Sequence, residues 1–104
     1  MGDAASRLAG PSMTKRLVPH PDVVARRLDD ALILVNLGTS RIFSLNGTGT
    51  RVWELLEAGS SVDEVERRLE DEYEVEKGLI EQEVTDLVGH LEREGLMTEA
   101  REEV

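Results

Sequence analysis

The first half of the chain contains three short apolar runs that are separated by turn residues. Residues 23–28 form one strand candidate, residues 32–37 are apolar on both faces, and residues 41–45 form a third run. Such short runs, rich in Val, Ile and Leu, predict β-strands. Residues 29–30 and 38–40 supply Asp, Gly and Ser for turns. Because strands joined by such short loops form hairpins, the pattern predicts an antiparallel meander whose third strand lies at an edge.

The second half of the chain has the spacing of amphipathic helices. The first helix is predicted from about residue 48 to residue 57, with Trp53 facing inward. Gly59 is placed to end this helix in a left-handed conformation. The second helix, which extends to Tyr73, opens with Ser61 and Glu64 in a capping box. In this motif the hydroxyl and the carboxylate each satisfy a free backbone N–H group.

A third helix is predicted over residues 77–94, with Gly95 as its cap. Leu96 and Met97 are expected to fold back onto the core. The apolar residues of this helix fall on one broad face, which we expect to pack inward: Leu79, Ile80, Val84, Leu87, Val88 and Leu91.

This order of elements predicts an α+β fold that is winged helix-turn-helix-like, with a three-stranded antiparallel sheet followed by three helices. Residues 17–98 are expected to form the folded domain. Residues 1–16 lack periodicity and are expected to be a disordered N-terminal extension, and residues 99–104 a frayed C-terminal tail.

From composition, the cytoplasm is the expected compartment. The chain has no Cys, no apolar run near the roughly 20 residues that span a membrane, and no secretory signal. Its net charge is −10 and unevenly placed, because residues 47–104 hold 18 acids and six bases, a balance of −12. We therefore expect a helical half that repels phosphate backbones and attracts cationic segments.

The sequence contains no convincing set of catalytic residues. Two isolated histidines, His20 and His90, without any Cys make a zinc site improbable, and no Ser has a convincing His partner. Residues 47–50 read GTGT and lack the Gly-Lys-Ser/Thr ending of a phosphate-binding loop, so these glycines are expected to allow a tight strand-to-helix turn. We expect a protein that is not an enzyme and that uses no cofactor or metal.

The predicted third strand offers a different kind of site. Phe43 and Leu45 share one of its faces, Ile42 and Ser44 share the other, and Arg41 alone blunts the edge at one end. An unpaired strand edge beside a helix with an apolar flank can accept an extended peptide as an additional strand. The pattern thus favours peptide binding.

A winged-helix fold also makes DNA binding a hypothesis. The third predicted helix sets Lys77 and Arg93 against five acids, which gives a balance of −3. Because DNA affinity depends on neutralising phosphates with Lys and Arg, this charge argues against binding to nucleic acid. A winged-helix transcriptional regulator, and a subunit that only stabilises an enzyme partner, remain the alternatives to a peptide-binding module.

Several motifs of this chain resemble those of the PqqD-like domains. The run FSLNGTGTRVWELL over residues 43–56 is followed by SVDEV over residues 61–65 and by Leu69 and Tyr73 at a fixed spacing. The pattern Val-x-x-Leu-Val-x-x-Leu over residues 84–91 and the Gly-Leu pair at 95–96 complete the similarity. The resemblance extends over roughly residues 23–98.

This resemblance implies that the chain is a recognition element for ribosomally synthesised and post-translationally modified peptides (RiPPs). Such domains bind the N-terminal leader of a precursor peptide as a strand added to the third strand, in the groove against the third helix. Free-standing members of this size act in lasso-peptide biosynthesis with a separate cysteine leader peptidase and a macrocyclase. Other members assist pyrroloquinoline quinone (PQQ) maturation beside a radical-SAM enzyme, which is a further alternative.

The resemblance also implies which residues bind the leader. The backbone of the third strand would pair with it, the third helix would form the groove wall, and the acids at 83, 86 and 94 would pair with leader Lys or Arg. The peptide-binding residues implied in this way are Arg41, Ile42, Phe43, Ser44, Leu45, Glu83, Val84, Asp86, Leu87, Val88, His90, Leu91 and Glu94.

Overall fold

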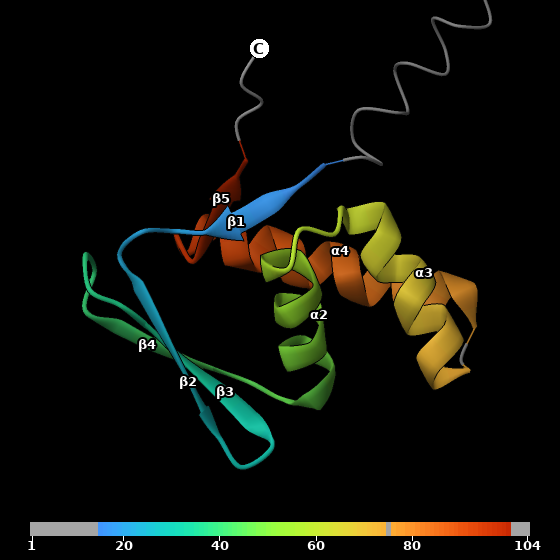
Figure 1. Cartoon of the computed structure of the whole chain (residues 1–104), viewed down its shortest axis with the longest axis horizontal. Helices are drawn as coiled ribbons and strands as arrows, with labels where there is room; N and C mark the ends of the chain where they lie inside the picture. Colours follow the sequence, from blue (N-terminus) through green and yellow to red (C-terminus); the bar gives the residue numbers. More distant parts are fainter. Residues whose placement is uncertain (1–14, 75, 101–104) are drawn as a thin grey trace, which may run out of the picture.

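A three-stranded antiparallel sheet and three helices make up most of the described chain, residues 15–74 and 76–100, in a computed structural model (Figure 1). This confirms the predicted α+β order. The elements are β1 (Leu17–Pro19), β2 (Val23–Leu28), β3 (Ala31–Asn36), β4 (Arg41–Leu45), α2 (Gly47–Glu57), α3 (Val62–Tyr73), α4 (Lys77–Arg93) and β5 (Met97–Glu99).

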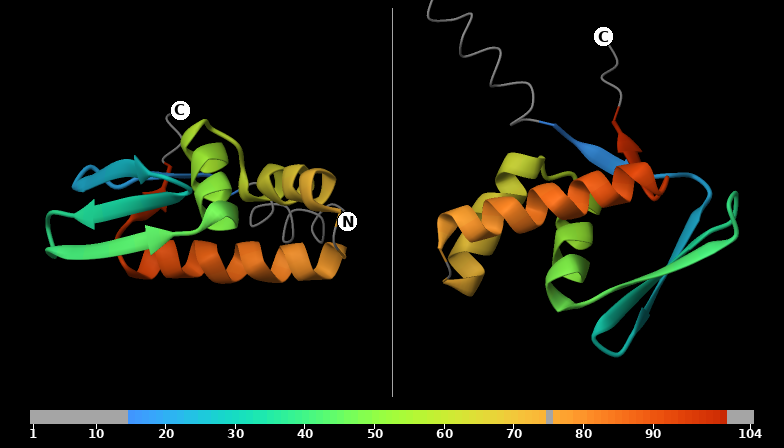
Figure 2. Two further views of the ribbon diagram at one scale, coloured as in Figure 1. Left: turned by 90° about the horizontal axis from the view of Figure 1, so that it is seen from below. Right: turned by 180° about the vertical axis from the view of Figure 1, so that it is seen from behind.

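The three-stranded sheet has the order β2-β3-β4, so β4 lies at an edge as predicted. In the register of the meander, Leu34 lies opposite Phe43 and Leu32 lies opposite Leu45. These residues turn toward the helices, and both leucines of β3 are buried. Figure 2 (left) shows β4 on the side of the sheet that is nearest to α4. The free edge of β4 is therefore the edge beside that helix.

A second, two-stranded sheet was not predicted. In it β1 pairs antiparallel with β5, and Leu17 and Met97 each turn a side chain into the core. Each strand has only three residues, with one buried position, so neither shows the alternation that marks a strand in sequence. The backbone N–H of Ala100 donates to the carbonyl of Arg16 at 2.9 Å, which extends this pairing by one step.

Residues just outside the predicted folded domain, 17–98, also take part in the fold. The carbonyl of Lys15 accepts the N–H of Val62 at 2.8 Å, and Arg16 forms a bridge with Ser61, so both residues contact the helical layer. Glu99, which we assigned to a frayed tail, is the last residue of β5. Residues 1–14 and 101–104 lie outside the described residues, and the disorder expected there stays a prediction.

The helix signals read from the sequence are confirmed. The Ser61 hydroxyl accepts the N–H of Glu64 at 3.2 Å, and the Glu64 carboxylate accepts the N–H of Ser61 at 2.8 Å. The hydrogen bond from the Ser61 backbone lowers the pKa of Glu64. Gly59 (φ 108°) and Gly95 (φ 69°) adopt the left-handed backbone that favours glycine at the ends of α2 and α4.

The hydrophobic core lies between the inner face of the sheet and the three helices. Trp53 faces inward as predicted and is only 2% exposed. It shares the core with buried residues of the other elements, and Val23 of β2 packs against this core; the largest fully buried side chains include Leu17, Leu34, Leu56, Leu69, Leu91, Leu96 and Met97.

The buried part of the apolar face of α4 is narrower than the sequence predicts. Ile80, Val84 and Val88 are buried in the core, whereas Leu79 is 52% exposed and Leu87 is half-buried. Successive helical residues are about 100° apart, so a core that covers one stripe leaves the neighbouring stripe uncovered. The prediction that Leu79 packs inward is therefore wrong.

Asn36 joins the sheet to the end of α4. Its side-chain NH₂ donates to the carbonyls of Gly95 (3.0 Å) and Glu94 (3.4 Å), and its Oδ1 accepts the N–H groups of Gly38 (2.9 Å) and Thr39 (3.2 Å). The side chain is buried, with 4% exposure. The Asn36 amide therefore provides hydrogen-bond partners for backbone groups of the β3–β4 turn and of the residues that follow α4.

We expect Asn36→Ala to destabilise the fold by about 2–4 kcal/mol, because part-buried backbone groups lose their partners. Asn46→Ala is the matched control, since it removes only a helix cap and should cost about 1 kcal/mol. Urea unfolding followed by circular dichroism measures both. Equal costs for the two variants would show that Asn36 does not hold α4 to the sheet.

Candidate functional site

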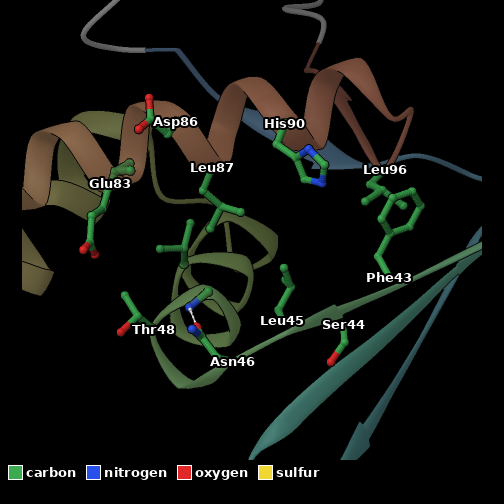
Figure 3. A pocket seen from close by; sticks show the side chains of 13 residues that line it. Phe43, Ser44, Leu45, Asn46, Thr48, Glu83, Asp86, Leu87, His90 and Leu96 are labelled. Atoms are coloured by element: carbon green, nitrogen blue, oxygen red, sulfur yellow. Dashed lines mark hydrogen bonds between the residues drawn. The ribbon is translucent and has the colours of Figure 1, made fainter.

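A groove of about 590 Å³ runs between β4 and α4, with the first turns of α2 at its base (Figure 3). This volume lies within the range of pockets that bind ligands. Its lining residues are Phe43, Ser44, Leu45, Asn46, Thr48, Gly49, Val52, Glu83, Val84, Asp86, Leu87, His90 and Leu96.

The base of the groove is apolar. Val52 of α2, Val84 of α4 and Leu96 after α4 are at most 1% exposed, so they belong to the core and offer only a small surface to the groove. Phe43 and Leu87 are half-buried and rise from opposite walls. Figure 3 shows both side chains pointing into the space between β4 and α4. An apolar side chain lying between them would lose contact with water.

The turn from β4 into α2 shapes one side of the groove. The Asn46 side-chain oxygen accepts the N–H of Gly49 at 3.0 Å, which caps α2, and the Thr50 hydroxyl donates to the Leu45 carbonyl at 3.1 Å. A Cβ on Gly49 would lie 3.3 Å from the Cβ of Leu45, whereas one on Gly47 would meet nothing within 4 Å. The close approach at Gly49 supports the predicted role of this segment as a tight turn.

Near the β3–β4 turn, side chains of β4 contact side chains at the C-terminal end of α4. Arg41 Nη1 lies 2.9 Å from Glu94 Oε1, and the Arg41 guanidinium carbon lies 5.3 Å from the centre of the Phe43 ring. The His90 ring meets Phe43 edge-on, with ring centres 5.8 Å apart. An exposed ion pair of this kind adds at most about 1 kcal/mol.

The rim of the groove on α4 is acidic. Glu83 and Asp86 are exposed, and none of the described residues that line the groove is Lys or Arg. In Figure 3 Glu83 points to the same side of α4 as Leu87, whereas the Asp86 carboxylate points away from the base. The Gln82 amide lies 3.4 Å from both oxygens of Asp86. A ligand in the groove would therefore meet negative charge on the helix side.

Eight of the thirteen residues expected to bind a peptide line this groove, and five do not. Ile42 is 69% exposed on the outer face of the sheet, and Arg41 and Glu94 pair with each other at the groove end. Val88 lines a different hollow, on the other side of α4, and Leu91 is fully buried. The peptide-binding role of all thirteen stays a prediction.

The sequence analysis did not assign Asn46, Thr48, Gly49, Val52 or Leu96 to the site, although they line the groove. Their position could have indicated a role in the site, because the first four lie where the edge strand leads into the following helix. Because the groove lies at this turn, residues that serve the turn also line the site. His90, which the resemblance implied as a peptide-binding residue, meets the Phe43 ring across the groove.

The carboxylates of the described residues whose pKa values are shifted lie outside the groove. The carboxylates with lowered pKa values, Glu64 and Glu72, hydrogen-bond to Ser61 and Arg51 respectively, and neither lines the groove. Within residues 15–74 and 76–100, no three His, Asp or Glu side chains gather to hold a metal ion. Across the same residues, no helix is long and apolar enough to cross a membrane.

Comparisons with known proteins found one family model and two solved structures that match this chain. Residues 31–97, more than half of the chain, match the family model described as Coenzyme PQQ synthesis protein D (PqqD). No curated protein matches the chain.

Two solved structures share the fold. One is TbiB1 in complex with the TbiA(beta) leader peptide, which is 28% identical, has a TM-score of 0.75, and is matched over 82% of this chain and 99% of that chain. The other is lasso peptide synthetase B1 complexed with the leader peptide, which is 25% identical, has a TM-score of 0.74, and is matched over 80% of this chain and 98% of that chain.

Proposed function

This chain belongs to the PqqD family, and from that premise we propose that its β4–α4 groove binds the leader of a ribosomally made precursor peptide by strand addition. As a PqqD-family RiPP recognition element it is a non-catalytic domain. Both solved relatives were studied with a leader peptide, and each is matched over nearly its whole length. The leader-binding role therefore concerns the whole domain and not a part of it.

The observation that carries this proposal is the unpaired edge of β4 beside an apolar groove. Within the described residues, β4 pairs with β3 and with no other strand. An extended peptide laid along Arg41–Leu45 would pair with the free N–H and C=O groups, and every second side chain would point toward Leu87. Edge and groove together offer both backbone pairing and side-chain selection.

Tight binding of a leader requires both backbone pairing with β4 and burial of leader side chains in the groove. A strand added along the five residues of β4 forms about four or five hydrogen bonds, each contributing roughly 0.5–1.5 kcal/mol. Ordering a disordered leader costs several kcal/mol, so backbone pairing alone would bind weakly. One or two apolar leader side chains buried in the groove add roughly 1.5–3 kcal/mol each, which brings the dissociation constant into the micromolar-to-nanomolar range.

The acidic rim adds a preference for cationic leaders. Glu83 and Asp86 stand at the groove with no Lys or Arg among the described lining residues, so a leader Lys or Arg beside α4 would be attracted and an acid repelled. Glu94, which the sequence analysis also assigned to this role, is paired with Arg41 at the groove end. We therefore assign the attraction mainly to the first two acids.

The proposed pathway is lasso-peptide biosynthesis, in which the domain delivers the bound leader to a separate cysteine peptidase and a macrocyclase. The likeness to lasso peptide synthetase B1 supports this assignment. The family model's description favours a second role, as a PQQ-type chaperone that presents a peptide to a radical-SAM enzyme. A winged-helix DNA regulator is disfavoured because α4 carries more acids than bases and would repel phosphates.

The outer face of the sheet supports delivery to a partner. Val24, Val35 and Ile42 lie side by side across the three strands and face away from the helices. Ile42 is 69% exposed and Leu28, on the same face, is 62% exposed. Because this apolar face borders the β4 edge, a peptidase docked on it would lie next to the bound leader.

Strand addition can be tested on the peptide. A synthetic leader of the precursor encoded beside this chain should lose about 2- to 12-fold in affinity when one amide that faces β4 is N-methylated, because one hydrogen bond is lost. Methylation at successive positions, read by fluorescence anisotropy, should weaken binding at every second residue. A flat response along the leader would contradict strand addition.

Leu87→Asp should weaken leader binding by about tenfold to a hundredfold, because it replaces an apolar side chain of the groove wall with a charged one. Leu87 is half-buried and is a cleaner choice than Val84, which is 1% exposed and belongs to the core. Leu37→Asp, on the 64% exposed turn residue, is the control and should bind normally. Unchanged affinity in a Leu87→Asp variant with native circular dichroism would rule out this groove.

Val24→Lys should slow leader cleavage by the pathway's peptidase while leaving leader affinity unchanged. The side chain is 41% exposed on β2, the strand farthest from the β4 edge, so a charge there would disturb only a partner on the outer face. Cleavage followed by mass spectrometry and leader anisotropy are measured in parallel, with Leu37→Lys as the control. A normal rate of leader cleavage with Val24→Lys would show that the peptidase does not dock on the outer face of the sheet.

A further inference from the structure

A second hollow, of about 210 Å³, continues the groove beyond the end of β4. It lies where the first turn of α2, the last turn of α3 and the first turns of α4 meet. It shares Thr48 and Glu83 with the groove, and its other lining residues are Tyr73, Leu79 and Ile80. We call it the Tyr73 hollow. The two spaces therefore meet at these shared residues.

One stripe of α4 faces both spaces. Leu79, Glu83 and Leu87 are spaced four residues apart, and residues at this spacing lie one above the other on a helix face. Leu87 lines the groove, Glu83 lines both spaces and Leu79 lines the hollow. A peptide that follows α4 past the end of β4 would therefore move directly from the groove into the hollow.

The hollow presents apolar side chains to solvent. Leu79 is 52% exposed and Tyr73 is 42% exposed, although they come from different helices, while Ile80 is 3% exposed and forms the base. Exposed apolar side chains that gather around a recess mark a binding surface more often than isolated ones do. The volume is below that of ordinary small-molecule pockets, so the recess fits a single side chain and not a separate ligand.

Two of the helices that form the hollow are joined by an ion pair. Arg51 Nε and Nη2 of α2 donate to Glu72 Oε1 and Oε2 of α3 at 3.1 and 2.8 Å, which holds the last turn of α3 against α2. This hydrogen bonding to Arg51 lowers the pKa of Glu72. Glu74, the C-cap residue that follows α3, adopts a left-handed conformation (φ 50°). A preformed recess does not have to be ordered on binding, which favours affinity.

We propose that the Tyr73 hollow is a second anchoring subsite, which takes one aliphatic or aromatic side chain of the leader outside the segment paired with β4. The proposal rests on the leader-binding function proposed above. From Leu87 to Leu79 is eight helical residues, which is about 12 Å at a rise of 1.5 Å each. An extended peptide covers that distance in about four residues, which sets the spacing between the two apolar anchors.

A double-mutant cycle between the protein and the leader tests this subsite. The probe is a fluorescein-labelled synthetic peptide with the complete leader of the precursor encoded beside this chain, together with its single-alanine versions. Leu79→Ser should weaken binding of the full leader by about tenfold, because the anchor loses its apolar wall. One alanine version should show no further loss with Leu79→Ser, and its position should lie about four residues from the one that couples to Leu87.

Two further variants distinguish binding in the Tyr73 hollow from a general effect of substitution. Tyr73→Ser changes the opposite wall from α3 and should couple to the same leader position, while Leu37→Ser in the β3–β4 turn should leave affinity unchanged. Both hollow residues are substantially exposed, and matching thermal unfolding confirms that the variants fold.

If the wild-type chain does not bind the leader, both the function and the subsite are wrong. If it binds and neither variant weakens it, or if only peptidase recruitment changes, the subsite alone is overturned.

Discussion

The groove depends on a gap between β4 and α4 that the protein holds open from both ends. At one end the buried amide of Asn36 ties the β3–β4 turn to the carbonyls that follow α4. At the other end the Asn46 cap turns the chain from β4 directly into α2, against which α4 packs through the core. Between these points helix and strand face each other without backbone hydrogen bonds. The separation is thus set by the fold, and within the described residues the edge of β4 that faces it pairs with no other strand.

The same arrangement explains how one helix can contribute to the core and also line the groove. Ile80, Val84 and Val88 of α4 are in the core, while the adjacent stripe with Leu79 and Leu87 remains partly exposed. A helix with a single apolar stripe could bury it and leave nothing for a ligand. Because α4 has a wider apolar surface than its core requires, the excess is left beside the free edge of β4.

Local signals in the sequence were enough to predict most of the fold. The three hairpin-linked strands, the capping box at Ser61 and the left-handed glycines at 59 and 95 depend on neighbouring residues, and each is present in the structure. The β1–β5 sheet was missed because it pairs distant segments with little periodicity of their own. The exposure of Leu79 was missed because helical spacing gives the width of an apolar face but not the part that its neighbours cover. The Arg41–Glu94 pair likewise joins residues far apart in sequence, and spacing does not reveal it.

The pairing of β1 with β5 has a consequence for how this domain can be joined to others. Leu17 lies opposite Glu99, and Arg16 accepts a hydrogen bond from Ala100, so the two ends of the described fold lie side by side. Figure 1 shows this pair on the opposite side of the molecule from the tip of the β2–β3 hairpin. A domain whose ends meet can be inserted as a cassette into a loop of a host protein, or circularly permuted, with little distortion of either partner. Evolution and engineering thus have the same two attachment points for linking leader recognition to a catalytic domain.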